Sequence, residues 1–291
     1  MSDRVVLEVA QWQGSAAPTA GRLRGGAAWL AELIPDGRRR TVTLDAGVGQ
    51  SRSGVRNADV LQRHLRAVRE ALAEVPPGAT TVTIGGDCGV DLAPVEAALS
   101  VFGDRLAVVW FDAHADLNTP ESSPSGAFHG MVLRALVGDG PEGLRPVRSL
   151  SADRVVLAGA RSLDPGERDL VARRGIRHLG VEQLTRPDPL LAAVRATGAE
   201  AVYVHIDLDV LDPGVFPAVG TPEPGGLGVD DLLGAVRALK EEFTLAGLAL
   251  TEYERTDDTG ETDDTGQTDD TGQEEAVLRR IVDGLFGSVR R

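Results

Sequence analysis

Leu106-Ala-Val-Val-Trp-Phe111 is a short apolar run, and Asp112-Ala-His114-Ala-Asp116 follows it directly. The run is too short for a buried helix and is typical of a buried parallel strand. Three potential metal ligands therefore come just after the carboxyl end of a predicted strand. Open α/β sheets bind their ligands at this end.

A second apolar run, Ala201-Val-Tyr-Val-His-Ile206, ends in Asp207-Leu-Asp209. Alternate residues of a strand face the same side, so both carboxylates can point at one place. His205 also shares that side unless the strand bulges, which leaves it either structural or a neighbour of these acids. Two clusters of carboxylates and imidazoles, each ending a buried strand, predict a metal site.

Strands and helices alternate along the chain, which predicts a parallel sheet with helices on both faces. The predicted strands cover residues 4–9, 41–44, 80–84, 106–111, 154–157, 201–206 and 246–251. The predicted helices cover residues 23–34, 58–75, 91–101, 129–137, 165–173, 190–196, 229–243 and 274–289.

The composition fits one α/β domain over all 291 residues, with 42% apolar residues to form a core. A net charge of -14 disfavours nucleic acid and anionic membranes as partners. Cys88 is the single cysteine, so no internal disulfide can form. We expect neither a signal peptide nor a segment that spans a bilayer, and we expect a cytoplasmic protein.

Residues 256–273 contain three copies of a six-residue acidic repeat, TDDTGE or TDDTGQ. The segment has no apolar residue and a glycine in every copy, so we expect a disordered or mobile loop. Asp/Gly repeats can bind calcium in other proteins, but these copies lack the bulky apolar position of a stacked calcium-binding repeat.

Four motifs together resemble the arginase/agmatinase ureohydrolase superfamily across roughly residues 80–255. They are Gly85-Gly-Asp-Cys88, the stretch 112–116, Ser125-Gly-Ala-Phe-His-Gly130 and His205-Ile-Asp-Leu-Asp-Val-Leu-Asp-Pro213. The resemblance implies a three-layer α/β/α sandwich with an eight-stranded, mostly parallel sheet. It also implies two Mn²⁺ ions that hydrolyse a guanidinium group to urea, and a homotrimer or homohexamer.

The resemblance also assigns the metal ligands. One ion would lie between Cys88, Asp112, Asp116 and Asp207, and the other between His114, Asp112, Asp207 and Asp209. Carboxylate oxygens with one imidazole suit Mn²⁺, and two ions close together lower the pKa of a water between them.

Two further residues match catalytic positions of the family. His129 matches the proton shuttle, and an imidazole with an ordinary pKa of about 6.5 suits proton transfer to a leaving amine. Glu252 ends the last predicted strand, where the family keeps a carboxylate for the guanidinium. Glu254 competes for that role.

The substrate is less clearly specified. Asp164 and Glu167 match the arginase loop that receives an α-amino group, and Asn118 and Ser125 match positions that hold an α-carboxylate. These residues favour arginine or a close derivative. However, Ala127 replaces a usual polar ligand of the carboxylate, and residues 220–226 are more similar to agmatinases and guanidinoacid hydrolases.

Cys88 is the main departure from the family, which nearly always has histidine there. A thiolate suits Zn²⁺, Fe²⁺ or Co²⁺ better than Mn²⁺, and a neutral thiol would hold the first ion weakly. We therefore expect a specialised ureohydrolase, in which the hydrolysis of N-hydroxyarginine would be impaired less than the hydrolysis of arginine. The alternatives are a small buried residue at this position and a metal-poor, non-catalytic member of the family.

Overall fold

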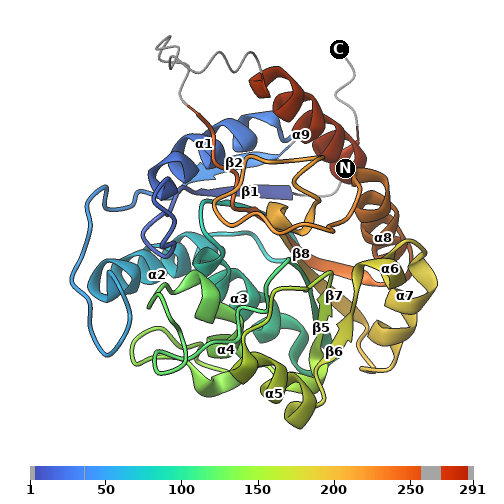
Figure 1. Cartoon of the computed structure of the whole chain (residues 1–291), viewed down its shortest axis with the longest axis horizontal. Coiled ribbons are helices and arrows are strands. Elements are labelled where there is room, and N and C mark those ends of the chain that lie inside the picture. The colour runs from blue at the N-terminus through green and yellow to red at the C-terminus, as the bar shows by residue number, and fades with distance from the viewer. Residues whose placement is uncertain (1–3, 36, 257–269, 288–291) are drawn as a thin grey trace.

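One sheet of eight strands runs through the computed structural model, which describes residues 4–35, 37–256 and 270–287 (Figure 1). All of its strand pairings are parallel, in the order β2-β1-β3-β8-β7-β4-β5-β6. The strands are β1 (Arg4–Val9), β2 (Arg38–Thr41), β3 (Thr80–Gly85), β4 (Leu106–Phe111), β5 (Val155–Ala158), β6 (Arg177–Leu179), β7 (Ala201–Asp207) and β8 (Thr244–Thr251). The predicted α/β class and eight-stranded sheet are confirmed.

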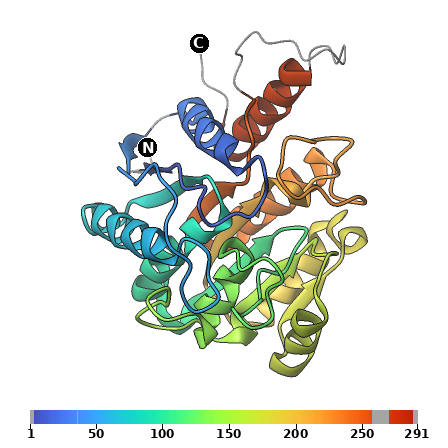
Figure 2. The same cartoon turned by 60° about the vertical axis from the view of Figure 1, so that its left-hand side comes forward.

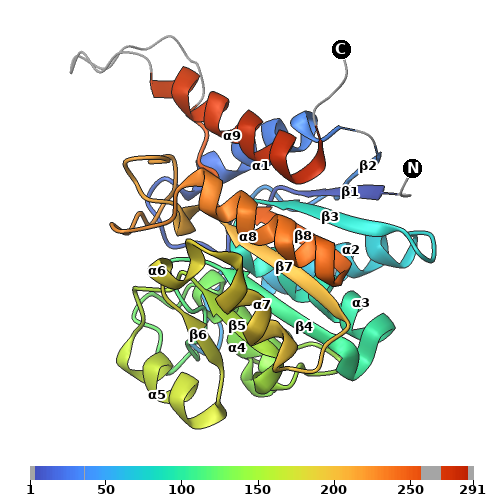
Figure 3. The same cartoon turned by 90° about the vertical axis from the view of Figure 1, so that its right-hand side faces the viewer.

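Helices cover both faces of this sheet. Helices α1 (Leu23–Leu33), α6 (Val181–Leu184), α7 (Pro187–Arg195), α8 (Val229–Glu242) and α9 (Asp270–Phe286) pack on one face. Helices α2 (Ala58–Ala73), α3 (Leu92–Phe102), α4 (Val132–Arg134) and α5 (Pro165–Arg174) pack on the other. Figure 2 shows α9 beside α1, and Figure 3 shows α8 and α2 on opposite sides of the sheet.

Strand β4 shows how the sequence builds these two layers. All six of its residues are buried, and they alternate between two apolar cores. Ala107, Val109 and Phe111 belong to the core that includes residues of α7 and α8, whereas Val108 and Trp110 belong to the core that includes residues of α3. A strand covered on both faces needs a continuous apolar run, which is the pattern that identified it.

Several predicted boundaries are wrong. Strand β2 covers Arg38–Thr41 rather than residues 41–44, and the predicted helix at 129–137 is a 3₁₀ turn, a short α4 and a π-helical turn. Helix α9 starts at Asp270, so residues 270–273 of the expected loop are helical. The rest of that loop, residues 257–269, lies outside the described residues.

The strand order determines where the site can form. Strands β3, β8, β7 and β4 are neighbours, and because they are parallel their carboxyl ends meet at one edge of the sheet. Asp207 is the last residue of β7, and the loops after β3, β8 and β4 carry Cys88, Glu252 and Asp112. Within the described part of the chain, no helix is both long and apolar enough to cross a membrane.

Candidate metal centre

The loop after β4 brings Asp112 and His114 into contact with Asp209. His114 Nδ1 lies 3.0 Å from Asp209 Oδ2 and 3.5 Å from Asp112 Oδ1. The three ligand atoms lie within 4.8 Å of one another, close enough to share one ion. Trp110 Nε1 donates to Asp112 Oδ2 at 2.9 Å and so fixes the orientation of this carboxylate.

The end of β7 supplies a second set of buried carboxylates. Asp207 Oδ1 accepts a hydrogen bond from the Asp209 backbone N–H at 2.8 Å. Asp209 Oδ1 accepts from the Ala113 backbone N–H at 3.0 Å, which links the loops after β7 and β4. Five of the six predicted ligands, Cys88, Asp112, His114, Asp207 and Asp209, therefore belong to groups that could hold an ion.

Asp116 lies beside these groups without belonging to any of them among the described residues. Its φ of +53° is in the left-handed region, which non-glycine residues seldom occupy. Its Oδ2 is buried and accepts no hydrogen bond from the part of the chain that the structure describes. A buried carboxylate oxygen without a donor indicates that a cation belongs nearby.

Cys88 is buried among polar groups and is not merely filling an apolar space. Its Sγ lies 3.0 Å from Asp207 Oδ2, 3.3 Å from Thr251 Oγ1 and 3.4 Å from His205 Nε2. Burial, followed by the charges of Asp207 and Glu252, raises the pKa of the thiol well above its ordinary value. Without a cation Cys88 is therefore a thiol that donates to Asp207.

His129 and Glu252 form a pair next to this cluster. His129 Nδ1 lies 3.1 Å from Glu252 Oε1, and the same oxygen accepts from the Cys88 backbone N–H at 3.0 Å. Glu252 is buried and has a φ of +65°, so the end of β8 is strained to place it there. Burial lowers the pKa of His129, but the charge of Glu252, its hydrogen bond and the charge of Asp87 together raise it more, and the pKa ends above its ordinary value.

The carboxylates of the cluster are buried close together, and additional positive charge would stabilise their ionised forms. Burial, together with the charges of Asp209 and Asp112, raises the pKa of Asp207 well above its ordinary value. Burial and Asp112 do the same for Asp116. His114 responds in the opposite sense: burial lowers its pKa, but Asp112 and Asp209 raise it to about 12. Divalent cations would supply the missing charge, so these donors fit a metal centre.

A cleft of about 140 Å³ lies over the cluster. Asn118, Asp164, Glu167, His114 and His129 line it, together with Asp116, Gly130, Ser162, Asp207 and Thr221. The predicted substrate ligand Ser125 is exposed and does not line the cleft; its Oγ accepts from the Ala127 backbone N–H at 3.2 Å.

The predicted amino-group ligands differ in how free they are. Both oxygens of Glu167 are occupied, by the backbone N–H groups of Leu117 and Asp164 at 2.8 Å each. Glu167 is thus the acidic partner of a capping box at the start of α5. Asp164 accepts from Asn118 Nδ2 at 2.8 Å and lines the cleft, so it remains accessible to a ligand.

Some residues that shape the site were not identified from the sequence. The Arg161 guanidinium donates to backbone carbonyls of Asp209 and Glu223, and so joins two loops at the rim. Glu223 also accepts from Ser162 Oγ at 3.0 Å, and its carboxylate lies 3.9 Å from His114. Only the Gly/Pro-rich character of residues 220–226 pointed to this loop.

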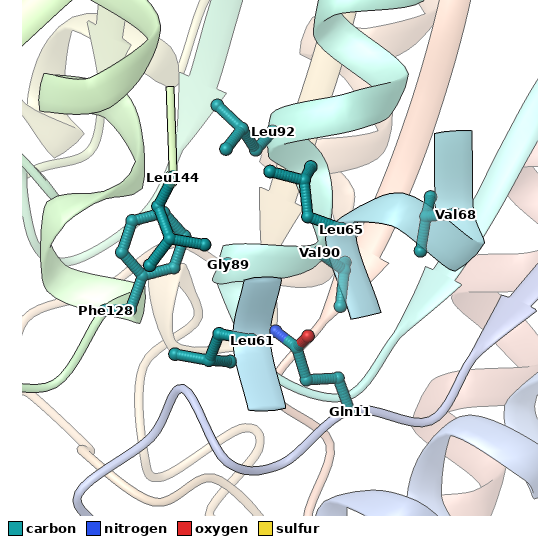
Figure 4. A pocket seen from close by; sticks show the side chains of 9 residues that line it. All are labelled: Gln11, Leu61, Leu65, Val68, Gly89, Val90, Leu92, Phe128 and Leu144. Carbon is teal, nitrogen blue, oxygen red and sulfur yellow. The ribbon is translucent and has the colours of Figure 1, made fainter. Parts of the chain in front are cut away.

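A second cavity lies between α2 and the 3₁₀ turn Cys88–Asp91 and is shown in Figure 4. Apolar side chains such as Leu61, Leu65 and Phe128 line it, and Gln11 is its one polar side chain. Its volume of about 10 Å³ is at most that of one water molecule, so it cannot hold a substrate.

Comparisons with known proteins identify the family of this chain. The model of the arginase family matches residues 31–269. The chain belongs to the arginase family. It is therefore a hydrolase of the ureohydrolase type, and its general activity is that of an amidinohydrolase.

Individual members of the arginase family show how close the relation is. An arginase of Staphylococcus aureus (strain COL) is 31% identical over 210 residues, which cover 68% of each chain. The structure of Bacillus caldovelox arginase covers 100% of both chains with a TM-score of 0.79 at 26% identity. Entamoeba histolytica arginase, solved in complex with L-ornithine, covers 99% of this chain and 100% of its own with a TM-score of 0.80; at 24% identity this shows the fold alone.

Proposed function

We propose that this protein hydrolyses the guanidinium group of arginine, or of a close derivative such as N-hydroxyarginine, with the help of two divalent cations. The observation that supports this most is the convergence of Cys88, Asp112, His114, Asp207 and Asp209 beneath a cleft lined by His129 and Asp164. For arginine, cleavage of the bond between the guanidinium carbon and the side-chain nitrogen consumes one water and releases ornithine and urea.

The cations would be held by the clustered side chains. Asp112, His114 and Asp209, with Asp207 close by, form an oxygen-rich set with one imidazole, which suits Mn²⁺. Cys88 would contribute to the other position, with Asp112 and Asp207. When bound, such a pair supplies Lewis acidity that lowers the pKa of water to near neutral.

His129 would transfer the proton that the leaving amine needs. Since Glu252 raises the pKa of His129, the ring stays protonated to a higher pH than a free imidazole. Its position on the cleft places that proton within the space available to substrate. Glu252 thus acts by orienting and charging His129, a different role from the guanidinium contact that the resemblance suggested.

Carboxylates lie in and beside the cleft, where a positively charged group of a substrate could bind. Asp164 lines the cleft and Glu223 lies beside its lining residue His114, so both offer carboxylates for an ammonium group, whereas Asn118 Nδ2 is already bonded to Asp164. This arrangement favours agmatine as a second candidate substrate, because agmatine carries an amine and no carboxylate.

Release of the amine product from arginine, N-hydroxyarginine, agmatine and guanidinobutyrate, with and without added Mn²⁺, tests these proposals. We expect metal-dependent turnover of an α-amino acid substrate. Asn118→Ala should then lower kcat/KM for arginine more than for agmatine. Turnover of agmatine alone would replace arginine by the second candidate, and no turnover of any of the four would reject the proposal.

His129→Asn tests the proton transfer separately from metal binding. We expect kcat to fall by about 10²–10⁴-fold, the usual contribution of a positioned general acid. Bound metal, measured by mass spectrometry, should stay at the wild-type level. Unchanged kcat would show that another group protonates the amine.

A further inference from the structure

His205 has one ring nitrogen directed at the metal cluster. It lies on β7, is fully buried, and its Nε2 is 3.4 Å from Cys88 Sγ. Its ligand atom, the Cys88 sulfur and an Asp112 oxygen all lie within 4.8 Å of one another. The family resemblance assigns no metal to this position, and Asp116, which it does assign, belongs to no such group among the described residues.

The other ring nitrogen is held in the way that metal-binding histidines usually are. His205 Nδ1 lies 2.7 Å from Asp91 Oδ2, so an ionised Asp91 accepts the Nδ1 proton and leaves the Nε2 lone pair facing Cys88. A histidine that binds a metal almost always donates its second ring N–H to a carboxylate or carbonyl. Asp91 Oδ1 is itself fixed by Tyr203 Oη at 2.7 Å.

Packing fixes the plane of the ring. The Trp110 ring stacks on His205 with 3.5 Å between centroids and 8° between planes, and the same indole donates to Asp112. Asp91 begins α3, yet its side chain makes no capping bond. These buried polar groups are costly, and a merely structural role would be met equally well by apolar residues.

The distance between sulfur and nitrogen also fits a shared ion. Zinc bonds of about 2.3 Å to sulfur and about 2.0 Å to nitrogen, at a tetrahedral angle, place the two ligand atoms about 3.5 Å apart. The observed separation is 3.4 Å. The 3.0 Å contact from Cys88 to Asp207, by comparison, is an ordinary hydrogen bond from the thiol.

We propose that His205 is a metal ligand, and that Cys88, His205 and Asp112 form a sulfur- and nitrogen-containing site for a borderline cation such as Zn²⁺ or Co²⁺. The centre then has two unlike positions, because Asp112, His114 and Asp209 form the harder one. This inference rests on the metal centre of the proposed function but not on the choice of substrate, so its test measures metal binding.

Cobalt binding to the full-length, chelator-treated protein provides the test. We expect two equivalents of Co²⁺ to bind, one of them with a sulfur-to-cobalt charge-transfer band. Cys88→Ser should abolish that band. His205→Gln should weaken the band-forming equivalent more than tenfold and leave the other within about twofold. Asp91→Asn should weaken it by about 10–100-fold, the usual effect of losing such a partner.

His64→Gln is the matched control, because His64 is equally buried and both of its ring nitrogens are hydrogen-bonded away from the cluster. It should leave both equivalents unchanged. An unchanged band and affinity in His205→Gln would overturn the inference while the proposed function stands. If the wild-type protein binds no Co²⁺, both proposals fail.

A second measurement leaves His205 unchanged, so that its result does not depend on whether the His205→Gln variant folds. The measurement is NMR of the His114→Asn protein, loaded with ¹¹³Cd and labelled with ¹⁵N at histidine; the substitution removes the other histidine that we assign to the centre. We expect one histidine ring nitrogen to show coupling to a ¹¹³Cd ion whose chemical shift indicates a thiolate ligand. The absence of any such coupling would overturn the assignment of His205.

Discussion

Cys88 is the residue at which this chain differs most from its family, and its surroundings determine what a replacement can do. A histidine at this position would offer a harder ligand than sulfur. We expect Cys88→His to raise bound Mn²⁺ and arginine turnover. Because Asp207, Thr251 and His205 all lie within 3.4 Å of the sulfur, the larger ring should also lower the unfolding free energy of the metal-free protein by about 1–3 kcal/mol.

Metal analysis by mass spectrometry, Mn²⁺-dependent turnover and urea unfolding measure these effects. Cys88→Ser is the control, since it keeps the size of the side chain and adds no strong ligand; it should raise neither Mn²⁺ content nor turnover. If Cys88→His changes neither quantity, the identity of this residue does not limit the centre.

At the residue scale the sequence predicted candidate ligands that the structure brings close together, but the grouping implied by the resemblance differs from the candidate groups in the structure. The positions of Asp112, His114, Asp207 and Asp209 follow from strand ends and the alternation of β strands. The role of His205 was left open, because the face of the sheet on which its side chain lies depended on whether β7 contains a bulge. The register shift lies at Val202/Tyr203, before His205, and β7 then pairs regularly through Asp207. Asp91 was hidden because an acid at a helix start is usually read as a cap.

Helix α5 is the element that positions the substrate end of the cleft. Glu167 accepts two backbone N–H groups, from Leu117 and Asp164, and so ties the start of α5 to the loop after β4. We expect Glu167→Ala to lower the unfolding free energy by about 2–4 kcal/mol, because it removes a cap and leaves buried donors unpaired. KM should rise as Asp164 and Asn118 lose their positions.

Glu167→Gln is the matched comparison. The single amide oxygen of glutamine can replace only one of the two acceptors. We therefore expect Glu167→Gln to lower the unfolding free energy by about half as much as Glu167→Ala, as measured by urea unfolding. Equal stability of Glu167→Ala and the wild type would show that the capping box does not stabilise α5.

Among the elements, buried ones were easier to predict than exposed ones. Strand β4 was located correctly because it is apolar throughout. Strand β2 was misplaced because it is an edge strand with three arginines, and edge strands carry charges that conceal them. The start of α9 was missed because residues 270–273 belong to the last copy of the polar repeat and look like the copies before it. Later residues of the helix, such as Leu278 and Ile281, are buried in the core, and this packing explains why the helix forms.

The stability of the whole molecule in acid should depend on His64. This residue joins α2 to two loops, since its Nε2 accepts from the Asp45 backbone N–H at 3.0 Å and its Nδ1 lies 3.1 Å from Gln11 Oε1. Burial lowers the pKa of His64 from 6.5 to about 4. The folded state therefore binds this proton less readily than the unfolded state does.

It follows that His64 supports full stability above pH 6.5 and that stability is lost as the pH falls toward 4. The loss from this one group should reach at most about 3 kcal/mol. Buried acids with raised pKa values, such as Asp87 and Asp207, act in the opposite direction. The contribution of His64 can be measured as the difference in unfolding free energy between the metal-free wild type and His64→Gln at a series of pH values. A difference that does not change with pH would contradict the assignment.

From its sequence, we expect the acidic repeat to affect the molecule through its charge. Residues 257–269 contain no apolar side chain and bring a concentration of acids to a chain of net charge -14. Replacing every Asp and Glu of this segment by Asn or Gln should change the unfolding free energy by less than about 0.5 kcal/mol, because the segment has no apolar side chain to contribute to a core. If anything, the reduced self-repulsion should raise stability slightly at low salt. Thermal unfolding of both proteins with and without Ca²⁺ measures this, and a Ca²⁺-dependent rise in Tm that the neutral variant lacks would instead identify the repeat as a calcium site.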